Sequence, residues 1–150
     1  MQTLRLTRSY RAFLVTGWIY WLYLLYAQGL AAFSYDLGIS LGTQEHAIRI
    51  TEVGTAIWWA FAFADALVYI PLLAAGLLGH AYKKRWGKTA LAAALGITVY
   101  WPVVSLAFIV DARGAEGWHL TGEPAYWVTL PLITLWAIWG FRLLLQDKNS

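Results

Sequence analysis

The chain has 150 residues, of which 60 % are hydrophobic and only 13 % are charged, whereas a soluble domain usually has about 25 % charged residues. It contains no cysteine, which excludes disulfides, thiol chemistry and thiolate metal sites. The net charge of +3 does not indicate nucleic-acid binding, because the basic residues lie where membrane topology requires them. We therefore expect a single integral membrane domain over residues 1–150.

Four apolar segments are long enough to cross a hydrocarbon core of about 30 Å as helices. They cover approximately residues 13–33, 53–78, 89–110 and 126–145. The first is too long for the apolar region of a signal peptide, and no clear cleavage site follows it. The sequence thus predicts an all-α membrane protein with a four-transmembrane-helix bundle. Ala92 and Gly96, four residues apart, form a row of small residues that predicts a tight bundle or, if the row faces outward, an oligomer.

Basic residues gather on one side of the predicted helices. On that side are Arg5, Arg8, Arg11, Lys83, Lys84, Arg85, Lys88, Arg142 and Lys148. Only Arg49 and Arg113 fall in the polar connections on the other side, residues 34–52 and 111–125. Because short loops rich in Lys and Arg remain in the cytoplasm, we expect a multi-pass protein of the cell's inner (plasma) membrane with cytoplasmic N- and C-termini.

One carboxylate, Asp65, lies near the middle of the second apolar segment. Placing an aspartate at the bilayer centre costs roughly 2.5–3.5 kcal/mol on insertion scales. We therefore expect Asp65 to be buried, uncharged and hydrogen-bonded. Helical spacing puts Gly54 and Trp58 on its face, with Phe61 and Tyr69 one turn to either side.

Aromatic side chains of the other segments are expected at the same depth. Trp and Tyr usually lie at the membrane interfaces, and when they are buried their N–H and O–H groups need partners such as Asp65. Pro102 and Pro71 each free a backbone carbonyl at membrane depth, which is tolerated where the helix packs in protein or lines a cavity. We therefore predict a mid-depth ligand site. Its residues are Asp65, Trp58, Phe61, Tyr69, Tyr100, Trp101, Tyr23 and Trp136.

Two histidines, His46 and His119, share the more acidic side with six carboxylates. A His/carboxylate metal site is chemically possible there, but neither H-x₃-H nor H-E-x-x-H occurs. We predict no metal site and keep His46 and His119 only as candidates. We predict no cofactor either; haem is disfavoured because no histidine lies within a predicted segment.

No motif in the chain specifies a reaction. The sequence favours a protein that binds a lipophilic ligand at mid-membrane depth, or an accessory subunit of a larger membrane complex. One alternative is an intramembrane enzyme with isomerase-like chemistry, in which Asp65 donates or accepts a proton; another is a proton-coupled carrier. Asp65 could instead be a purely structural acceptor that joins helices. The expected partners are membrane lipids, a lipophilic small molecule, and further copies or other membrane proteins.

In size and in its four-span layout the chain resembles the DoxX family and the EXPERA-type small membrane proteins. The resemblance covers the architecture of most of the chain and no motif. The acidic and histidine positions of sterol-isomerase EXPERA members have no residue-by-residue match here. The resemblance implies a four-helix membrane fold and transfers no function.

Overall fold

A computed structural model describes residues 8–146 of the chain. Within that range the protein is helical and contains no strand. Four helical segments are long and apolar enough to cross a membrane: Arg8–Phe33, Ala47–Ala81, Arg85–Ala112 and Glu123–Gln146. The predictions of an all-α fold and of four candidate spans are therefore confirmed. Arg5 and Lys148, used above for orientation, lie outside the described residues.

Two of the four spans are interrupted by a π-helical turn. The first consists of α1 (Arg8–Leu24), the π-helix η1 (Leu25–Gly29) and α2 (Leu30–Phe33). The second consists of α4 (Ala47–Ala64), the π-helix η2 (Asp65–Tyr69) and α5 (Ile70–Ala81). The third and fourth spans are α6 (Arg85–Ala112) and α7 (Glu123–Gln146), and the short helix α3 (Tyr35–Ser40) follows the first span.

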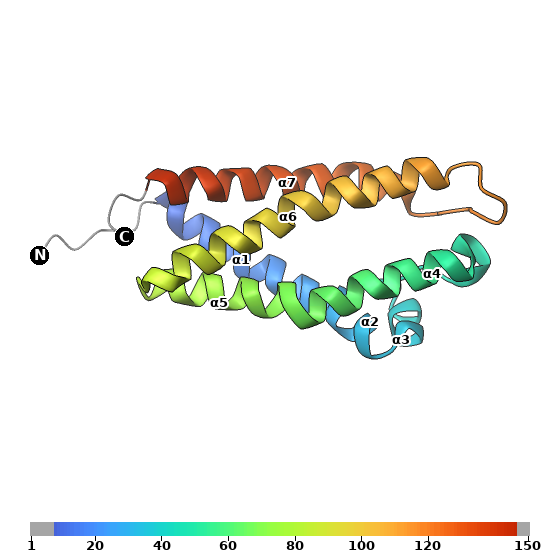
Figure 1. The fold of residues 1–150 in the computed structure, drawn as a ribbon, viewed down its shortest axis with the longest axis horizontal. Helices are drawn as coiled ribbons and strands as arrows, with labels where there is room; N and C mark the ends of the chain where they lie inside the picture. The colour runs from blue at the N-terminus through green and yellow to red at the C-terminus, as the bar shows by residue number, and fades with distance from the viewer. Residues whose placement is uncertain (1–7, 147–150) are drawn as a thin grey trace, which may run out of the picture.

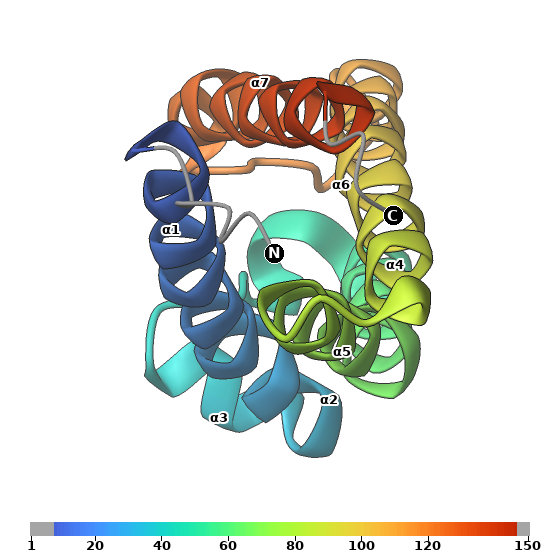
Figure 2. The same cartoon turned by 90° about the vertical axis from the view of Figure 1, so that its left-hand side faces the viewer.

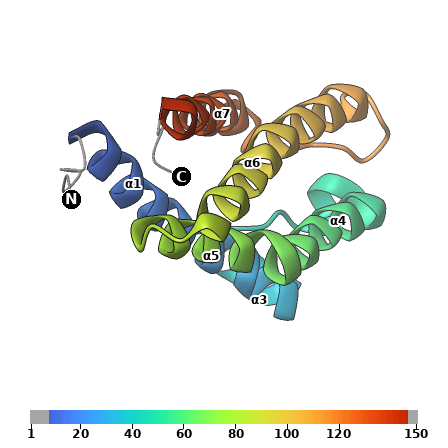
Figure 3. The same cartoon turned by 60° about the vertical axis from the view of Figure 1, so that its left-hand side comes forward.

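The spans run along the length of the molecule in alternating directions (Figure 1). The start of α1, the α5–α6 turn and the end of α7 lie at one end, which we call the basic end because Lys83, Lys84 and Arg85 are there. The start of α4 and the α6–α7 connection lie at the other end. We call this the acidic end because the six carboxylates of residues 34–52 and 111–125 belong to it. Viewed from the basic end, α1, α7, α6 and α5 follow one another around the bundle (Figure 2). Figure 3 shows α4 and α6 diverging away from the α5–α6 turn.

Glycines let α5 and α6 approach closely at the basic end. A Cβ built on Gly76 would lie 2.6 Å from the Cα of Leu91, and one on Gly87 would overlap the backbone of Gly79 and His80. A Cβ on Gly96 would meet nothing within 4 Å. The close approach of the third span within the chain therefore occurs at Gly87, and Gly96 faces away from the neighbouring helices, which is the outward-facing alternative for this row.

The π-helix η2 lies directly before Pro71. In it, the backbone N–H of Ile70 donates to the carbonyl of Asp65, five residues earlier. Proline has no N–H and its ring collides with the carbonyl four residues before it, so a wider turn at this point relieves the helix. Pro102, in contrast, lies within the continuous helix α6. Single π-turns are often found at functional sites, and this one begins at Asp65.

The polar connection predicted over 34–52 is shorter than expected. The helix α3 begins within it because the Ser34 hydroxyl accepts a hydrogen bond from the N–H of Leu37 (3.3 Å). The helix α4 begins at Ala47, where the Nδ1 of His46 accepts from the N–H of Ile48 (3.2 Å). The backbone leaves the helical region at Thr51 (φ 65°, ψ 168°), whose hydroxyl accepts from the N–H of Gly54 (3.3 Å), so the uninterrupted helix of the second span begins after Thr51, close to the predicted residue 53. At the basic end α5 also extends further, to Ala81, so His80 lies in its last turn.

Candidate functional site

Asp65 lies between two hydrophobic cores. The core toward the basic end includes Tyr69, Ile70 and Leu73, and the core toward the acidic end includes Trp58, with Phe61 packed against it. Asp65 falls between Phe61 and Tyr69 on the second span and is only 4 % exposed. The bundle therefore buries a carboxyl group where its two apolar cores meet.

Contacts across the bundle give the depth of Asp65 relative to α6. The Tyr69 hydroxyl lies 2.5 Å from the Thr98 hydroxyl, and the rings of Phe61 and Trp101 meet edge to face at 6.2 Å. Asp65 lies between Tyr69 and Phe61 and is therefore level with residues 98–101 of α6. This agrees with the expected depth of Trp101.

No hydrogen bond or ion pair to the Asp65 carboxyl occurs among residues 8–146. Two polar side chains that bond to the neighbouring residues 69 and 70 or extend from them have other partners. The indole N–H of Trp21 donates to the carbonyl of Ile70 (2.9 Å), and the Tyr69 hydroxyl bonds to Thr98. The expectation that Asp65 accepts hydrogen bonds from aromatic side chains is wrong: Trp21 donates to a backbone carbonyl and Tyr69 to Thr98, and the indole N–H groups of Trp58 and Trp101 do not reach the carboxyl.

Other buried polar atoms on the acidic-end side also lack partners. Within the described chain, the indole nitrogens of Trp58, Trp101 and Trp118 and the hydroxyl of Ser105 make no hydrogen bond. Trp101 and Ser105 are one turn apart on α6. Trp58 contacts Phe61 at 5.9 Å between ring centroids. Indole N–H groups and a hydroxyl therefore lie on the two helices that diverge beyond Asp65.

A short chain of hydroxyls occupies the basic-end side of Asp65. Thr98 donates to the carbonyl of Ala94 (2.8 Å), so the Tyr69 hydroxyl donates to Thr98. The hydroxyl of Tyr20, from α1, lies 3.5 Å from that of Tyr69. This chain of hydroxyls joins η2 to α1 and α6 and leaves the carboxyl oxygens of Asp65 without a bond.

The structure brings together five of the eight predicted site residues. Asp65, Trp58, Phe61, Tyr69 and Trp101 all lie in or beside the region where the cores meet.

The other three predicted residues are elsewhere. Tyr100 and Tyr23 are 67 % and 57 % exposed, so they face outward. Trp136 stacks on Phe13 and donates from its indole N–H to the Thr16 hydroxyl (2.8 Å) on α1, and its ring meets that of Tyr20 at 5.5 Å, so it borders the region from the side of α1. Depth along a span can be estimated from sequence, but the rotation of each helix about its axis cannot, and rotation is what turns Tyr100 and Tyr23 away from Asp65.

Three residues that belong to this region were absent from the predicted site. Tyr20 and Thr98 form the hydroxyl chain, and Ser105 is fully buried on α6. A four-residue step along α6 from Trp101 points to Ser105. No comparable signal points to Tyr20, whose role depends on how α1 crosses η2.

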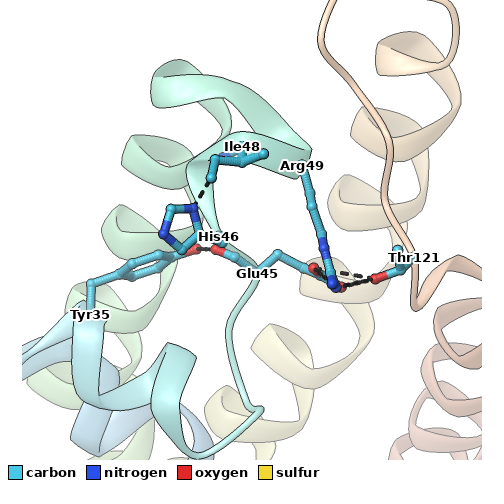
Figure 4. A network of polar contacts seen from close by, with 6 residues as sticks. All are labelled: Tyr35, Glu45, His46, Ile48, Arg49 and Thr121. Atoms are coloured by element: carbon cyan, nitrogen blue, oxygen red, sulfur yellow. Dashed lines mark hydrogen bonds and ion pairs between the residues drawn. The ribbon is translucent and has the colours of Figure 1, made fainter.

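At the acidic end, a polar network joins the two long connections (Figure 4). The guanidinium of Arg49 donates to the hydroxyl of Thr121 (2.8 Å), and that hydroxyl donates to the carboxylate of Glu45 (3.1 Å). Arg49 also pairs with Glu45 at 3.5 Å. The Tyr35 hydroxyl donates to the backbone carbonyl of Glu45 (3.0 Å). Burial raises the pKa of Tyr35 well above its ordinary value, so this phenol remains a donor.

The two candidate metal ligands are not placed as a metal site. His46 caps α4, and the backbone N–H of His119 donates to the carbonyl of Arg49 (2.5 Å). Residues 8–146 contain no group of three or more His, Asp or Glu side chains arranged to hold a metal ion. A hollow of about 520 Å³ opens beside Glu45, His46 and Arg49. It lies at the acidic end, apart from Asp65.

No family model, curated protein or solved structure matches this chain. The likeness to the DoxX and EXPERA-type proteins therefore remains one of size and layout. Arguments about function rest on the geometry around Asp65.

Proposed function

We propose that this multi-pass membrane protein binds a lipophilic ligand whose polar group lies beside Asp65, between η2 and α6. The observation that carries the proposal is the set of buried polar atoms without partners, the indole N–H groups of Trp58 and Trp101 and the hydroxyl of Ser105, together with Asp65, which is 4 % exposed and whose carboxyl makes no hydrogen bond within residues 8–146. Buried polar groups in native proteins nearly always have a hydrogen-bond partner. The membrane core supplies no bulk water to serve as one.

A small ligand fits these groups better than a partner protein does. Asp65 is 4 % exposed, so a helix of another chain cannot reach its carboxyl from outside the bundle. A small molecule entering from the membrane can pass Phe61 and Trp101, which are only partly buried. A mid-depth site is also where helix bundles commonly hold ligands.

Native mass spectrometry of the detergent-purified chain tests this proposal. The wild type is expected to retain a small-molecule adduct of defined mass, and Asp65→Asn to lose it, because the amide cannot provide the same charge or proton. Asp111→Asn, which changes an exposed acid at the end of α6, is the matched control and should keep the adduct.

The proposal is contradicted if wild type and Asp65→Asn give the same spectra, with or without adducts. A circular dichroism spectrum of each variant verifies that the helices are intact. An isomerase-like reaction leaves the adduct mass unchanged, so an Asp65-dependent change in the chromatographic retention of the extracted ligand during incubation would identify the acid–base enzyme alternative instead.

We also propose that the protein lies in the inner (plasma) membrane with both termini in the cytoplasm. The clustering of Lys83, Lys84 and Arg85 at one end of the bundle supports this orientation.

Because the chain has no cysteine, single cysteines can report the orientation. In intact cells, Glu116→Cys should react with a membrane-impermeant maleimide, and Lys84→Cys should react only after permeabilisation. Both positions are exposed, so accessibility within the protein does not limit labelling. The reverse pattern would overturn the proposed orientation.

A further inference from the structure

Asp65 has no cation to pair with inside the protein. No Lys or Arg occurs between Arg11 and Arg49, between Arg49 and Lys83, or between Lys88 and Arg113. The carboxyl makes no ion pair or hydrogen bond with any other residue in 8–146. An unpaired carboxylate in such a place is so costly that the group takes up a proton unless a positive charge is brought to it.

Aromatic rings lie on both sides of this carboxyl. Phe61 and Trp101 meet edge to face on the acidic-end side, with Trp58 beside Phe61. On the basic-end side, Tyr20 and Tyr69 lie 6.5 Å apart between ring centroids. Aromatic faces attract a cation within about 6 Å, by about 0.5–2 kcal/mol each depending on desolvation. A carboxylate surrounded by aromatic side chains is a suitable environment for an organic cation.

The other titratable groups near Asp65 do not compete for this role. Those that interact with it are Tyr20 from α1 and Tyr69 from η2. Tyr23 of α1 and Tyr100 of α6 are exposed. The tyrosine hydroxyls engage one another and Thr98, which leaves Asp65 as the acid in the region that can exchange a proton for a cation.

We propose that the ligand is a lipophilic organic cation that pairs with the carboxylate of Asp65 and displaces its proton. This inference rests on the proposed ligand-binding function and specifies its ligand class. In the exchange, the O–H bond of Asp65 breaks, the proton passes to bulk water and the cation takes its place, so the charge at the site is conserved. Phe61 and Trp101, which are only partly buried, contact the apolar body of the cation, whereas Trp58 stays stacked on Tyr126.

Titration calorimetry of the full chain in detergent, with tetraphenylphosphonium as the probe, tests this inference. Measurements in two buffers with different heats of ionisation should show about one proton released per cation bound. Affinity should rise about tenfold per pH unit while Asp65 remains protonated in the free protein. Asp65→Asn should abolish binding, Asp65→Glu should retain part of it, and Asp111→Asn should behave as wild type.

Two variants of Trp101 separate a cation site from a hydrogen-bonding site. Trp101→Phe keeps an aromatic face but removes the N–H donor, so the affinity for tetraphenylphosphonium should change less than about threefold. Trp101→Leu removes the face and should weaken binding about tenfold or more. If both variants lose binding equally, the indole N–H is the essential feature and the cation proposal is overturned.

Neutral and anionic probes of the same shape complete the test. Tetraphenylsilane and tetraphenylborate should bind at least about tenfold more weakly than the cation. If the neutral probe binds in an Asp65-dependent manner and the cation does not, the ligand-binding function stands and the cation inference fails. If the cation binds wild type and Asp65→Asn equally, the inference also fails. If no probe binds and no adduct copurifies, both proposals fail.

Discussion

Replacing Gly87 with alanine is expected to force α5 and α6 apart and to lower the free energy of unfolding by about 1–3 kcal/mol. A Cβ at this position would overlap the backbone of Gly79 and His80. Backbone atoms cannot move aside as a flexible side chain can, so the helices themselves must separate. The buried residues that join these helices farther along, such as Leu73 and Leu91, would lose packing. Reversible unfolding in mixed micelles, followed by circular dichroism, measures the change.

Gly96→Ala is the matched control on the same helix. A Cβ there meets nothing within 4 Å, and alanine favours a helix over glycine by about 0.8–1.0 kcal/mol. The variant should therefore unfold at the same or slightly higher denaturant fraction than wild type. Equal losses for Gly87→Ala and Gly96→Ala would contradict the packing described here, because they would reflect glycine replacement in general.

Replacing Asp65 with leucine is expected to stabilise the ligand-free protein by about 1–3 kcal/mol while abolishing ligand binding. The carboxyl is buried and makes no hydrogen bond within the described residues, so its removal breaks no bond. It also removes an insertion cost of roughly 2.5–3.5 kcal/mol. Binding sites often retain groups that reduce stability. The same unfolding assay, performed after ligand removal, measures the effect.

Tyr69→Phe provides a comparison of opposite sign. Its hydroxyl bonds to Thr98 at 2.5 Å and lies 3.5 Å from that of Tyr20. Removing this hydroxyl leaves its buried hydrogen-bond partners unsatisfied, which should lower the free energy of unfolding by about 1–3 kcal/mol. If Asp65→Leu destabilises the protein as Tyr69→Phe does, Asp65 is a structural acceptor that joins the helices, and the ligand-site interpretation is wrong.

The span boundaries show where reading the chain from composition alone fails. Hydropathy places the second span from about residue 53, which matches the uninterrupted helix after Thr51, but it misses the helical turn before it, which begins at Ala47 where His46 supplies a cap. A capping interaction depends on one side chain and one N–H, so it leaves little trace in average hydropathy. The π-helix at Asp65 is similarly hidden. Pro71 predicts that the helix is disturbed nearby. It does not predict that the disturbance is a π-helical turn that begins at Asp65.

What the sequence by itself determined is the helical class, the number of candidate membrane spans and the position of Asp65 along the second of them. These follow from apolar length and from position along a helix, which are local properties of the chain.

Only the tertiary structure decided which side chains meet at that depth. It turned Tyr100 and Tyr23 outward, placed Trp101 against Phe61, and directed the Tyr69 hydroxyl to Thr98 instead of Asp65. The physical reason is that the side chains that meet in a helix bundle depend on how each helix is rotated about its axis and on the angle at which the helices cross. Close contacts between glycines of different helices, such as Gly79 with Gly87, determine the rotation and the crossing angle, and they cannot be read from one helix alone.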